Sequence, residues 1–247
     1  MLFALAAHAE IRTISSMQEL TPLVDRETIL VFDIDNTVLR PTQTFGSDQF
    51  FRYIEKGAKD RGMNAAGAKA WALKTATAFQ PKSPVVAVEE MTPEMIREYQ
   101  LSGITVFALT ARPAIWTKDT IRQLDGLTVD FSHTAPANLG LQKGIHFQTP
   151  GNEKGPDLVK LLAQFRKHGE KVIFVDDRPS NVESVDKALT AEGIPVLTLR
   201  YAAADPWVNS FDSRIAELQW QEFKFNGRFM SDEEALCILR QPMAAGF

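Results

Sequence analysis

The sequence is organised around one apolar stretch that ends in two aspartates. Residues 30–32 (Leu-Val-Phe) form an apolar, partly β-branched run of the kind found in buried strands, and Asp33 and Asp35 follow directly. On an extended segment, residues two positions apart point to the same side, so the two carboxylates face one point in space. Like charges held this close repel each other unless a cation lies between them. The stretch therefore indicates a charged site, and the plainer alternative is a polar strand end with an Asx turn.

Two later apolar runs also end in polar residues. Residues 104–109 lead into Thr110 and Arg112, and residues 171–175 lead into Asp176 and Asp177. These runs are continuous rather than alternating, and helical segments lie between them, which is typical of a parallel sheet with both faces covered. We predict an α/β fold in which a Rossmann-like parallel sheet is covered by helices on both faces. In such a sheet the carboxyl ends of the strands share one edge, where ligands bind.

The segment between the first two core strands has a different character. Residues 41–90 are mostly helical in pattern, with helices expected over 47–54 and 64–78, and we interpret this segment as an inserted helical cap. Residues 10–40 and 91–247 would then form the core. The remaining predictions are strands over 11–17, 127–131 and 194–199, a hairpin over 133–149, and helices over 92–103, 114–125, 156–168, 179–193, 213–224 and 231–240.

Charge and composition exclude several classes of function. The formal net charge is −4 and no block of Lys or Arg stands out, which argues against a nucleic-acid or membrane-surface partner. No run of about 20 apolar residues is present, so we expect no membrane-spanning helix. The single cysteine, Cys237, permits neither an internal disulfide nor a cysteine metal site. A small anionic substrate remains compatible with the net charge, because a local cation can override it.

The first nine residues carry a possible export signal. They are apolar and end in Ala-His-Ala before Glu10, which is the pattern of a signal-peptide end with its cleavage site, although the basic start is missing and the apolar part is short. We interpret residues 1–9 as a signal-peptide remnant and expect a periplasmic or secreted location. The alternatives are an ordinary apolar first turn and a cytoplasmic protein.

Four motifs together resemble those of the haloacid dehalogenase (HAD) superfamily. They are Asp-x-Asp-Asn-Thr-Val at 33–38, a strand that ends at Thr110, Lys154 before a helix, and Asp-Asp-x-x-x-Asn at 176–181. Their order and spacing match, and the matched span of residues 29 to about 185 covers most of the chain. The form of the first motif and the insertion resemble the acid-phosphatase-like members, and among these the exported bacterial proteins of unassigned role.

The resemblance implies a Mg²⁺-dependent phosphatase that works through an aspartyl-phosphate. Asp33 would be the nucleophile, and Asp35 would protonate the leaving group and later activate the water that hydrolyses the intermediate. The metal would be held by the Asp33 carboxylate, the backbone carbonyl of Asp35, Asp176, and Asp177 either directly or through water. Asp35 would have to be protonated when the substrate arrives.

The other motif residues would hold the transferred phosphoryl group. The resemblance assigns this role to Thr110 and Lys154, with help from Thr37. Arg112 would be either a substrate contact or one half of a surface ion pair, and Asn181 would orient the loop of Asp177. Each residue also has an ordinary interpretation: a strand terminus for Thr110, a solvated loop cation for Lys154, and a helix N-cap pair for the two adjacent aspartates.

The expected partner is a small phosphorylated substrate, with a phosphopeptide as one option, and neither nucleic acid nor membrane. The sequence leaves monomer and dimer equally open. Two alternative functions remain at this stage. One is a non-catalytic secreted binding or effector protein that keeps the metal site, and the other is a phosphotransferase of the same superfamily.

Overall fold

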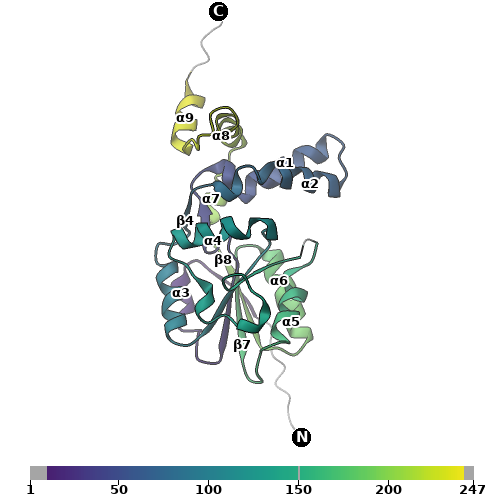
Figure 1. Ribbon diagram of the computed structural model, residues 1–247, viewed down its shortest axis with the longest axis vertical. Coiled ribbons are helices and arrows are strands. Elements are labelled where there is room, and N and C mark those ends of the chain that lie inside the picture. Colours follow the sequence, from purple (N-terminus) through teal and green to yellow (C-terminus); the bar gives the residue numbers. More distant parts are fainter. Residues whose placement is uncertain (1–9, 150, 242–247) are drawn as a thin grey trace, which may run out of the picture. The chain divides into compact units, whose positions relative to one another are not determined.

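The computed structural model describes residues 10–149 and 151–241 (Figure 1). Residues 1–9, on which the export interpretation depends, lie outside the described part. The chain divides into two compact units. The core unit comprises the described residues through Leu39 together with Ala87–Ala204, and the insertion unit comprises Arg40–Val86 together with the described residues from Asp205 onward.

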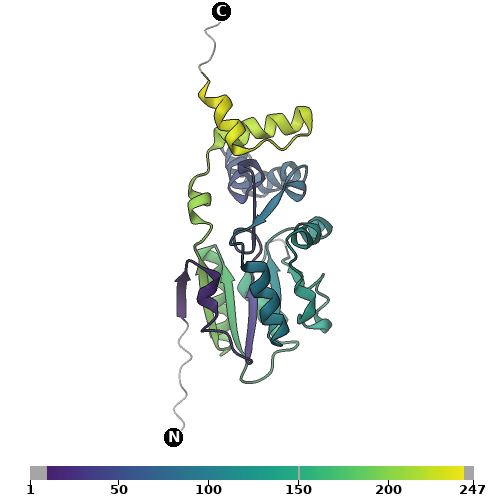
Figure 2. The same ribbon diagram turned by 90° about the vertical axis from the view of Figure 1, so that its left-hand side faces the viewer.

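The core unit is built on a six-stranded, fully parallel sheet, which confirms the predicted α/β class. Figure 2 shows β1, in dark purple, at one edge of this sheet. The central strand β2 is the apolar run that precedes Asp33. In spatial order the strands are β1 (Glu10–Ile14), β8 (Val196–Tyr201), β7 (Lys171–Asp176), β2 (Thr28–Phe32), β5 (Thr105–Thr110) and β6 (Ile145–Phe147).

Alternate residues of the central strand face opposite layers of helices and connecting segments. Ile29 and Val31 of β2 pack with apolar residues of α5 (Lys154–Leu162) and α6 (Pro179–Ala191). Phe32 points to the other side, where its ring contacts that of Phe131 at 6.3 Å between centroids. Helix α3 (Thr92–Leu101) packs against β5, and α4 (Thr117–Gly126) follows that strand. All five residues of β2 are buried, which explains why its sequence is a continuous apolar run.

Two predicted elements after α4 are wrong. Residues 127–131 do not form a strand, because Thr128 has a φ of 59°, outside the extended region, and the chain continues into a 3₁₀ helix over Phe131–His133. Residues 133–149 do not form a two-stranded hairpin, although Gln142 and Ile145 make an isolated antiparallel bridge. Instead, Ile145–Phe147 pairs in parallel with the end of β5 and becomes the edge strand β6. The local pattern is that of a hairpin, but the sheet offers a longer-range partner.

The insertion unit is mostly helical, and it also contains residues 205–241. Helix α1 (Asp48–Asp60) begins after Ser47, whose hydroxyl accepts a hydrogen bond from the Phe50 backbone, and α2 (Ala65–Ala76) follows. The short strands β3 (Leu39–Pro41) and β4 (Val85–Ala87) pair with each other where the chain enters and leaves the insertion. From the end of the chain come α7 (Asp205–Asn209), α8 (Ser213–Asn226) and α9 (Asp232–Arg240).

An aromatic cluster explains why residues 205–241 belong to this unit and not to the core, where the sequence-based division placed them. The ring of Phe45 contacts those of Phe79, Phe223 and Phe229 at 4.9–5.7 Å between centroids. The insertion segment thus supplies half of a core whose other half comes from α8 and the loop that follows it. None of the helices among the described residues is long and apolar enough to cross a membrane.

A buried hydrogen-bond network joins the same two segments. One Asp232 oxygen accepts hydrogen bonds from the backbone N–H of Thr44 at 2.9 Å and from Nε2 of Gln219 at 2.6 Å, and the other accepts from the Thr44 hydroxyl at 2.7 Å. The fully buried Gln219 side chain also accepts a hydrogen bond from the backbone of Phe45 at 3.0 Å. Charged acceptors strengthen such bonds, so Asp232 is the principal polar link between the segments.

We expect Asp232→Ala to lower the free energy of unfolding by about 1–3 kcal/mol, because it leaves buried donors without an acceptor. The matched control is Glu233→Ala, which removes the neighbouring, exposed carboxylate from the same first turn of α9. The control should cost less than about 1 kcal/mol. Urea unfolding measures both, and equal losses would show that the network contributes nothing beyond the helix terminus.

Candidate active site

The first motif forms a tight turn at the carboxyl end of β2. The backbone N–H of Asp33 donates to the carbonyl of Val175 at 2.9 Å, so the sheet pairing continues one residue beyond the strand. The chain then reverses at Asn36, which has a φ of 59°, a left-handed conformation that asparagine tolerates better than most residues. The N–H groups of Val38 and Leu39 donate to the Ile34 carbonyl and close the turn.

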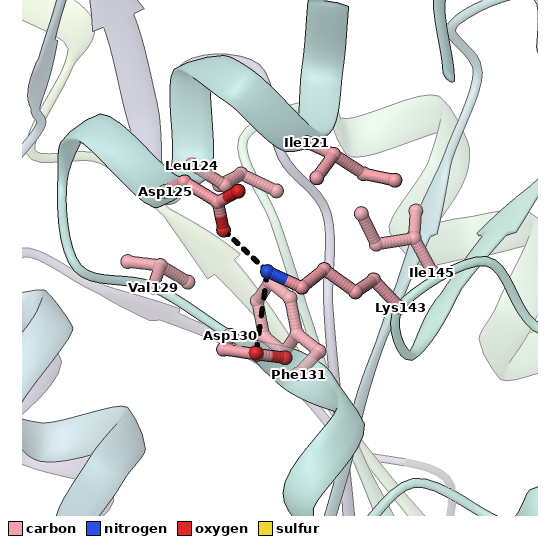
Figure 3. Close-up of a pocket in the computed structure, with 8 residues that line it drawn as sticks. All are labelled: Ile121, Leu124, Asp125, Val129, Asp130, Phe131, Lys143 and Ile145. Atoms are coloured by element: carbon pink, nitrogen blue, oxygen red, sulfur yellow. Dashed lines mark hydrogen bonds and ion pairs between the residues drawn. The ribbon is translucent and has the colours of Figure 1, made fainter. Parts of the chain in front are cut away.

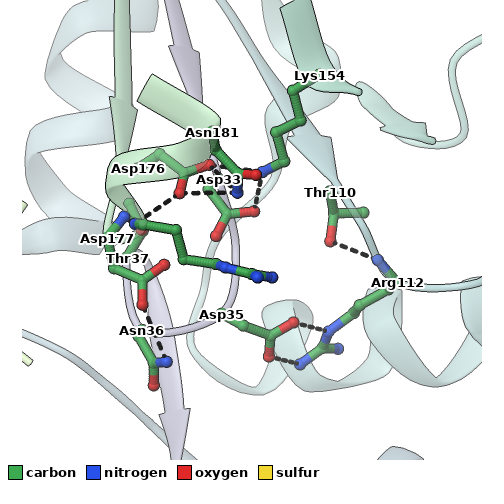
Figure 4. A network of polar contacts seen from close by, with 11 residues as sticks. Asp33, Asp35, Asn36, Thr37, Thr110, Arg112, Lys154, Asp176, Asp177 and Asn181 are labelled. Carbon is green, nitrogen blue, oxygen red and sulfur yellow. Dashed lines mark hydrogen bonds and ion pairs between the residues drawn. The ribbon is translucent and has the colours of Figure 1, made fainter. Parts of the chain in front are cut away.

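Three carboxylates meet at this edge of the sheet. Each of Asp33, Asp176 and Asp177 offers an oxygen, and these oxygens lie within 4.8 Å of one another (Figure 4). Asp176 is fully buried and accepts hydrogen bonds from the backbone of Arg178 at 2.9 Å and from Nδ2 of Asn181 at 3.0 Å. Asn181 therefore orients Asp176, whereas the sequence interpretation assigned it to the Asp177 loop. A set of carboxylate oxygens at this spacing suits a hard divalent cation.

Lys154 lies between two of these carboxylates. Its ammonium group is 2.5 Å from Oδ1 of Asp33 and 2.8 Å from Oδ2 of Asp176, and its side chain is only 1% exposed. Burial alone would lower the pKa of Lys154, but the attraction of Asp176 and Asp33 outweighs it and raises the pKa. Burial also raises the pKa of Asp33 to about 7, against the opposing attraction of Lys154. The ordinary interpretation of Lys154 as a solvated loop cation is therefore wrong.

Asp35 is held by a buried arginine. Its two oxygens accept hydrogen bonds from Nε and Nη2 of Arg112 at 2.8 and 2.7 Å, and Arg112 is only 6% exposed. Nη1 of Arg112 donates to Thr120 at 3.1 Å and to Gln123 at 2.7 Å, both on α4. Arg112 is thus one half of a buried ion pair and not of a surface one. Sequence reasoning missed Thr120 and Gln123, although their spacing of three places both on one helix face.

The two motif threonines support neighbouring loops. Thr110 accepts a hydrogen bond from the backbone of Arg112 at 3.2 Å, and Thr37 accepts one from the backbone of Asp177 at 3.1 Å. Asn36 also donates to the Asp177 carboxylate at 3.2 Å. Both threonine side chains are fully buried, so in this structure they fix the backbones that carry Arg112 and Asp177. The predicted site residues therefore gather at the carboxyl ends of β2, β5 and β7 and at the start of α5.

The position of Lys154 depends on the glycine that follows it. Helix α5 begins at Lys154, two residues earlier than expected, and Gly155 packs directly on α6. A Cβ atom on Gly155 would lie 2.1 Å from the backbone oxygen of Ser184. The Ser184 hydroxyl also accepts a hydrogen bond from the Gly155 N–H at 3.2 Å and donates one to Glu153 at 3.1 Å. Close contact between the two helices therefore fixes the place from which the lysine reaches the carboxylates.

An apolar hollow elsewhere in the core unit is not part of this site. It is lined mainly by residues of α4, β6 and the loops around them, and Lys143 lies over it, 2.6 Å from Asp125 and 3.4 Å from Asp130 (Figure 3). None of the predicted site residues lines it.

The fold and the site together define an α/β protein with a lysine-bridged aspartate cluster at the carboxyl edge of its parallel sheet. The sequence matches the family described as "Protein of unknown function (DUF2608)" over residues 10–236. The chain belongs to this family.

The similar proteins are bacterial. A Chlamydia pneumoniae protein that carries a provisional outer membrane protein name is 26% identical over 254 residues, which cover 98% of this chain and 93% of that protein. A similarly named protein of Chlamydia trachomatis serovar D is 24% identical over 85% of this chain and 82% of its own length. An uncharacterised protein of Rickettsia prowazekii is 23% identical over 92% of this chain and 88% of its own length.

Solved structures with a partial likeness include hydrolases. A haloacid dehalogenase-like family hydrolase of Streptococcus pneumoniae has a TM-score of 0.45 and 12% identity, over 69% of this chain and 93% of that chain. The class C acid phosphatase of Bacillus anthracis has a TM-score of 0.37 and 15% identity, over 92% of this chain and 84% of that chain. At this level of likeness, the function has to be argued from the residues of the chain itself.

We expect Gly155→Ala to lower the free energy of unfolding by about 1–3 kcal/mol, because the added methyl group overlaps the backbone of α6. The matched control is Gly126→Ala, at the end of α4, where an added Cβ atom would meet no atom within 4 Å. The control should stay within about 0.5 kcal/mol of the wild type. Thermal and urea unfolding test both variants, and an unchanged Gly155→Ala protein would contradict the tight packing.

The raised pKa of Asp33 predicts a pH dependence of stability in the metal-free protein. Between the pKa of an unfolded aspartate, about 3.9, and about 7 the folded state holds the extra proton, so the free energy of unfolding falls as pH rises. In the Asp33→Asn variant this group no longer titrates. The free energy of unfolding of the variant, relative to the wild type, should therefore increase as pH rises to about 7, by at most about 1.4 kcal/mol per pH unit. Above about pH 7 the difference between the two proteins should stay constant.

Urea unfolding in the presence of a chelator, at intervals from about pH 2 to about pH 8, measures this difference. Asp25→Asn provides a control of opposite sign, because a hydrogen bond from Lys171 lowers the pKa of the Asp25 carboxyl. As pH rises, the free energy of unfolding of Asp25→Asn should fall relative to the wild type, and this change should occur at lower pH than the one for Asp33→Asn. A pH-independent difference for Asp33→Asn would contradict the burial argument.

Proposed function

We propose that this protein is a Mg²⁺-dependent phosphomonoester hydrolase that works through an aspartyl-phosphate on Asp33. The observation that carries the proposal is the meeting of three carboxylates and one ammonium group at the carboxyl end of the central strand. Carboxylates alone would repel a phosphate, whereas carboxylates that share a divalent cation, with an ammonium group beside them, can bind it.

The donor set fits the proposed metal. Asp33, Asp176 and Asp177 would hold Mg²⁺, with the backbone carbonyl of Asp35 as a further ligand, and all of these are the oxygen donors that Mg²⁺ prefers. When bound, the ion would neutralise phosphate charge and act as a Lewis acid. Lys154 already balances part of the charge of Asp33 and Asp176, so it lies where a phosphoryl group on Asp33 would need a cation.

The chemistry assigned to the residues has two steps. In the first, a carboxylate oxygen of Asp33 attacks phosphorus, the bond to the leaving oxygen breaks, and Asp35 gives that oxygen a proton. In the second, water attacks the aspartyl-phosphate, its proton returns to Asp35, and Asp33 and inorganic phosphate are released. Because both Asp35 oxygens are bonded to Arg112, proton transfer requires one of them to turn away from the guanidinium.

One observation favours a non-catalytic alternative. The ammonium of Lys154 pairs with two of the three clustered carboxylates, and Arg112 pairs with Asp35, so the acidic groups are already partly neutralised. A binding or effector protein that senses a phosphorylated partner could keep such a site without turnover. A phosphotransferase would use the same first step and differ only in the acceptor that takes the phosphoryl group from Asp33.

We expect Asp33→Asn to reduce Mg²⁺-dependent hydrolysis of p-nitrophenyl phosphate by at least about 10³-fold, because an amide is a poor nucleophile. The matched control is Asp60→Asn, the same chemical change at an exposed aspartate of α1, which should leave the rate unchanged. Hydroxylamine trapping of the wild type during turnover, followed by peptide mass spectrometry, should place a hydroxamate on Asp33. A wild type without metal-dependent turnover on a broad phosphoester panel would favour the non-catalytic alternative.

We also propose that the protein acts outside the cytoplasm. The provisional outer membrane names of the chlamydial relatives and the Ala-His-Ala sequence before Glu10 both support export. Mass spectrometry of the N-terminus of the native protein tests this. Glu10 as the first residue would support cleavage, and a retained Met1 would contradict it.

A further inference from the structure

Three arginines lie at the edge of the sheet that carries the aspartate cluster, and two of them are committed to protein groups. All four hydrogen bonds of the Arg112 guanidinium go to Asp35, Thr120 and Gln123. Arg200 of β8 lies opposite Asp176 of β7 in the strand register, and its Nε donates to the Asp177 carbonyl at 3.2 Å. The sequence left Arg112 as either a substrate contact or one half of a surface ion pair, but its donors are used for Asp35, Thr120 and Gln123.

Arg178 differs from both. It is the N-cap residue of α6, and its backbone N–H donates to Oδ1 of Asp176 at 2.9 Å, which places its Cα directly beside the cluster. Its side chain is half-buried, yet its guanidinium makes no hydrogen bond or ion pair with any described residue. None of its guanidinium nitrogens is among the buried unpaired atoms of the described residues, so their donors keep access to solvent and are available to a ligand. Such a group next to a phosphate site is suited to binding an anionic ligand.

We propose that Arg178 binds a second oxyanion of the substrate, outside the phosphoryl group that is transferred. This inference rests on the proposed phosphatase function and narrows its substrates to phosphoesters whose leaving group carries a carboxylate or another phosphate. The transferred phosphoryl group has its own cation in Lys154, which is bonded to the nucleophile Asp33. Arg178 begins a different helix, and its backbone N–H is bonded to Oδ1 of Asp176, whereas Lys154 is bonded to Oδ2 of the same residue.

The chemistry of the two cations supports this division. Lysine is a compact point charge, whereas arginine presents a planar fork of donors that matches the two oxygens of a carboxylate or phosphate. A substrate with two anionic groups would therefore place the transferred phosphoryl at Lys154 and the metal ligands, and the second group at Arg178. Arg178 would act as a specificity residue and take no part in the bond-making steps.

Binding of unreactive probes tests the proposal independently of turnover. Calorimetric titration in Mg²⁺, at fixed free metal concentration, compares methylphosphonate, which has one anionic group, with phosphonoacetate and methylenediphosphonate, which have two. The wild type should bind at least one of the latter at least about tenfold more tightly than methylphosphonate, as expected for a hydrogen-bonded charge pair. Whichever probe gains more identifies a carboxylate or a phosphate as the second group.

Arg178→Gln should bring this affinity ratio close to one, and Arg178→Lys should keep only part of it. Arg97→Gln, at an exposed arginine of α3, makes the same change in net charge and should leave the ratio unaltered. The proposal is overturned if the wild type does not discriminate, if Arg178→Gln keeps the ratio, or if it weakens all three probes equally. Failure of the phosphatase function would show separately, as absent p-nitrophenyl phosphate turnover with the affinity ratio intact.

Discussion

The site depends on one buried interaction, the ammonium group of Lys154 between the carboxylates of Asp33 and Asp176. Each of these groups would be unstable alone in this interior, because an isolated buried charge loses its hydration without compensation. Together they compensate one another, and the cost of burial remains visible in the raised pKa of Asp33. The arrangement places a nucleophile and the cation that would receive the phosphoryl charge within hydrogen-bond distance before any ligand arrives.

Much of the surrounding structure holds these groups in place. The contact of Gly155 with the backbone of Ser184 fixes the start of α5 and hence Lys154. Asn181 and the backbone of Arg178 hold Asp176, while Thr37 holds the backbone of Asp177. Most of these supports come from the first turns of helices that follow the strands. Their rigidity allows four charged side chains from distant parts of the sequence to keep a fixed geometry.

The three arginines at this edge show how similar residues take different roles. Arg112 and Arg200 are used within the protein, whereas the guanidinium of Arg178 has no partner among the described residues. Asp35, whose proposed role requires it to exchange protons, is the carboxylate that Arg112 holds. The insertion unit is held together differently. The rings of Phe45 and Phe79, from the inserted segment, pack with that of Phe223 from α8, and Asp232 accepts a hydrogen bond from the Thr44 backbone.

The sequence by itself determined the parallel α/β fold, because continuous apolar strands that alternate with helices can be buried in few other ways. It also determined that Asp33, Asp35, Thr110, Asp176 and Asp177 gather at one edge, since strand ends in a parallel sheet converge. Lys154 was assigned to this edge only through the resemblance to a known family. Only the tertiary structure decided that residues 145–147 form an edge strand and that α8 and α9 belong to the insertion unit. It also decided that the Arg112 guanidinium pairs with Asp35, whereas that of Arg178 has no partner among the described residues. These outcomes depend on partners distant in the chain, and local patterns carry no information about which partner will be close.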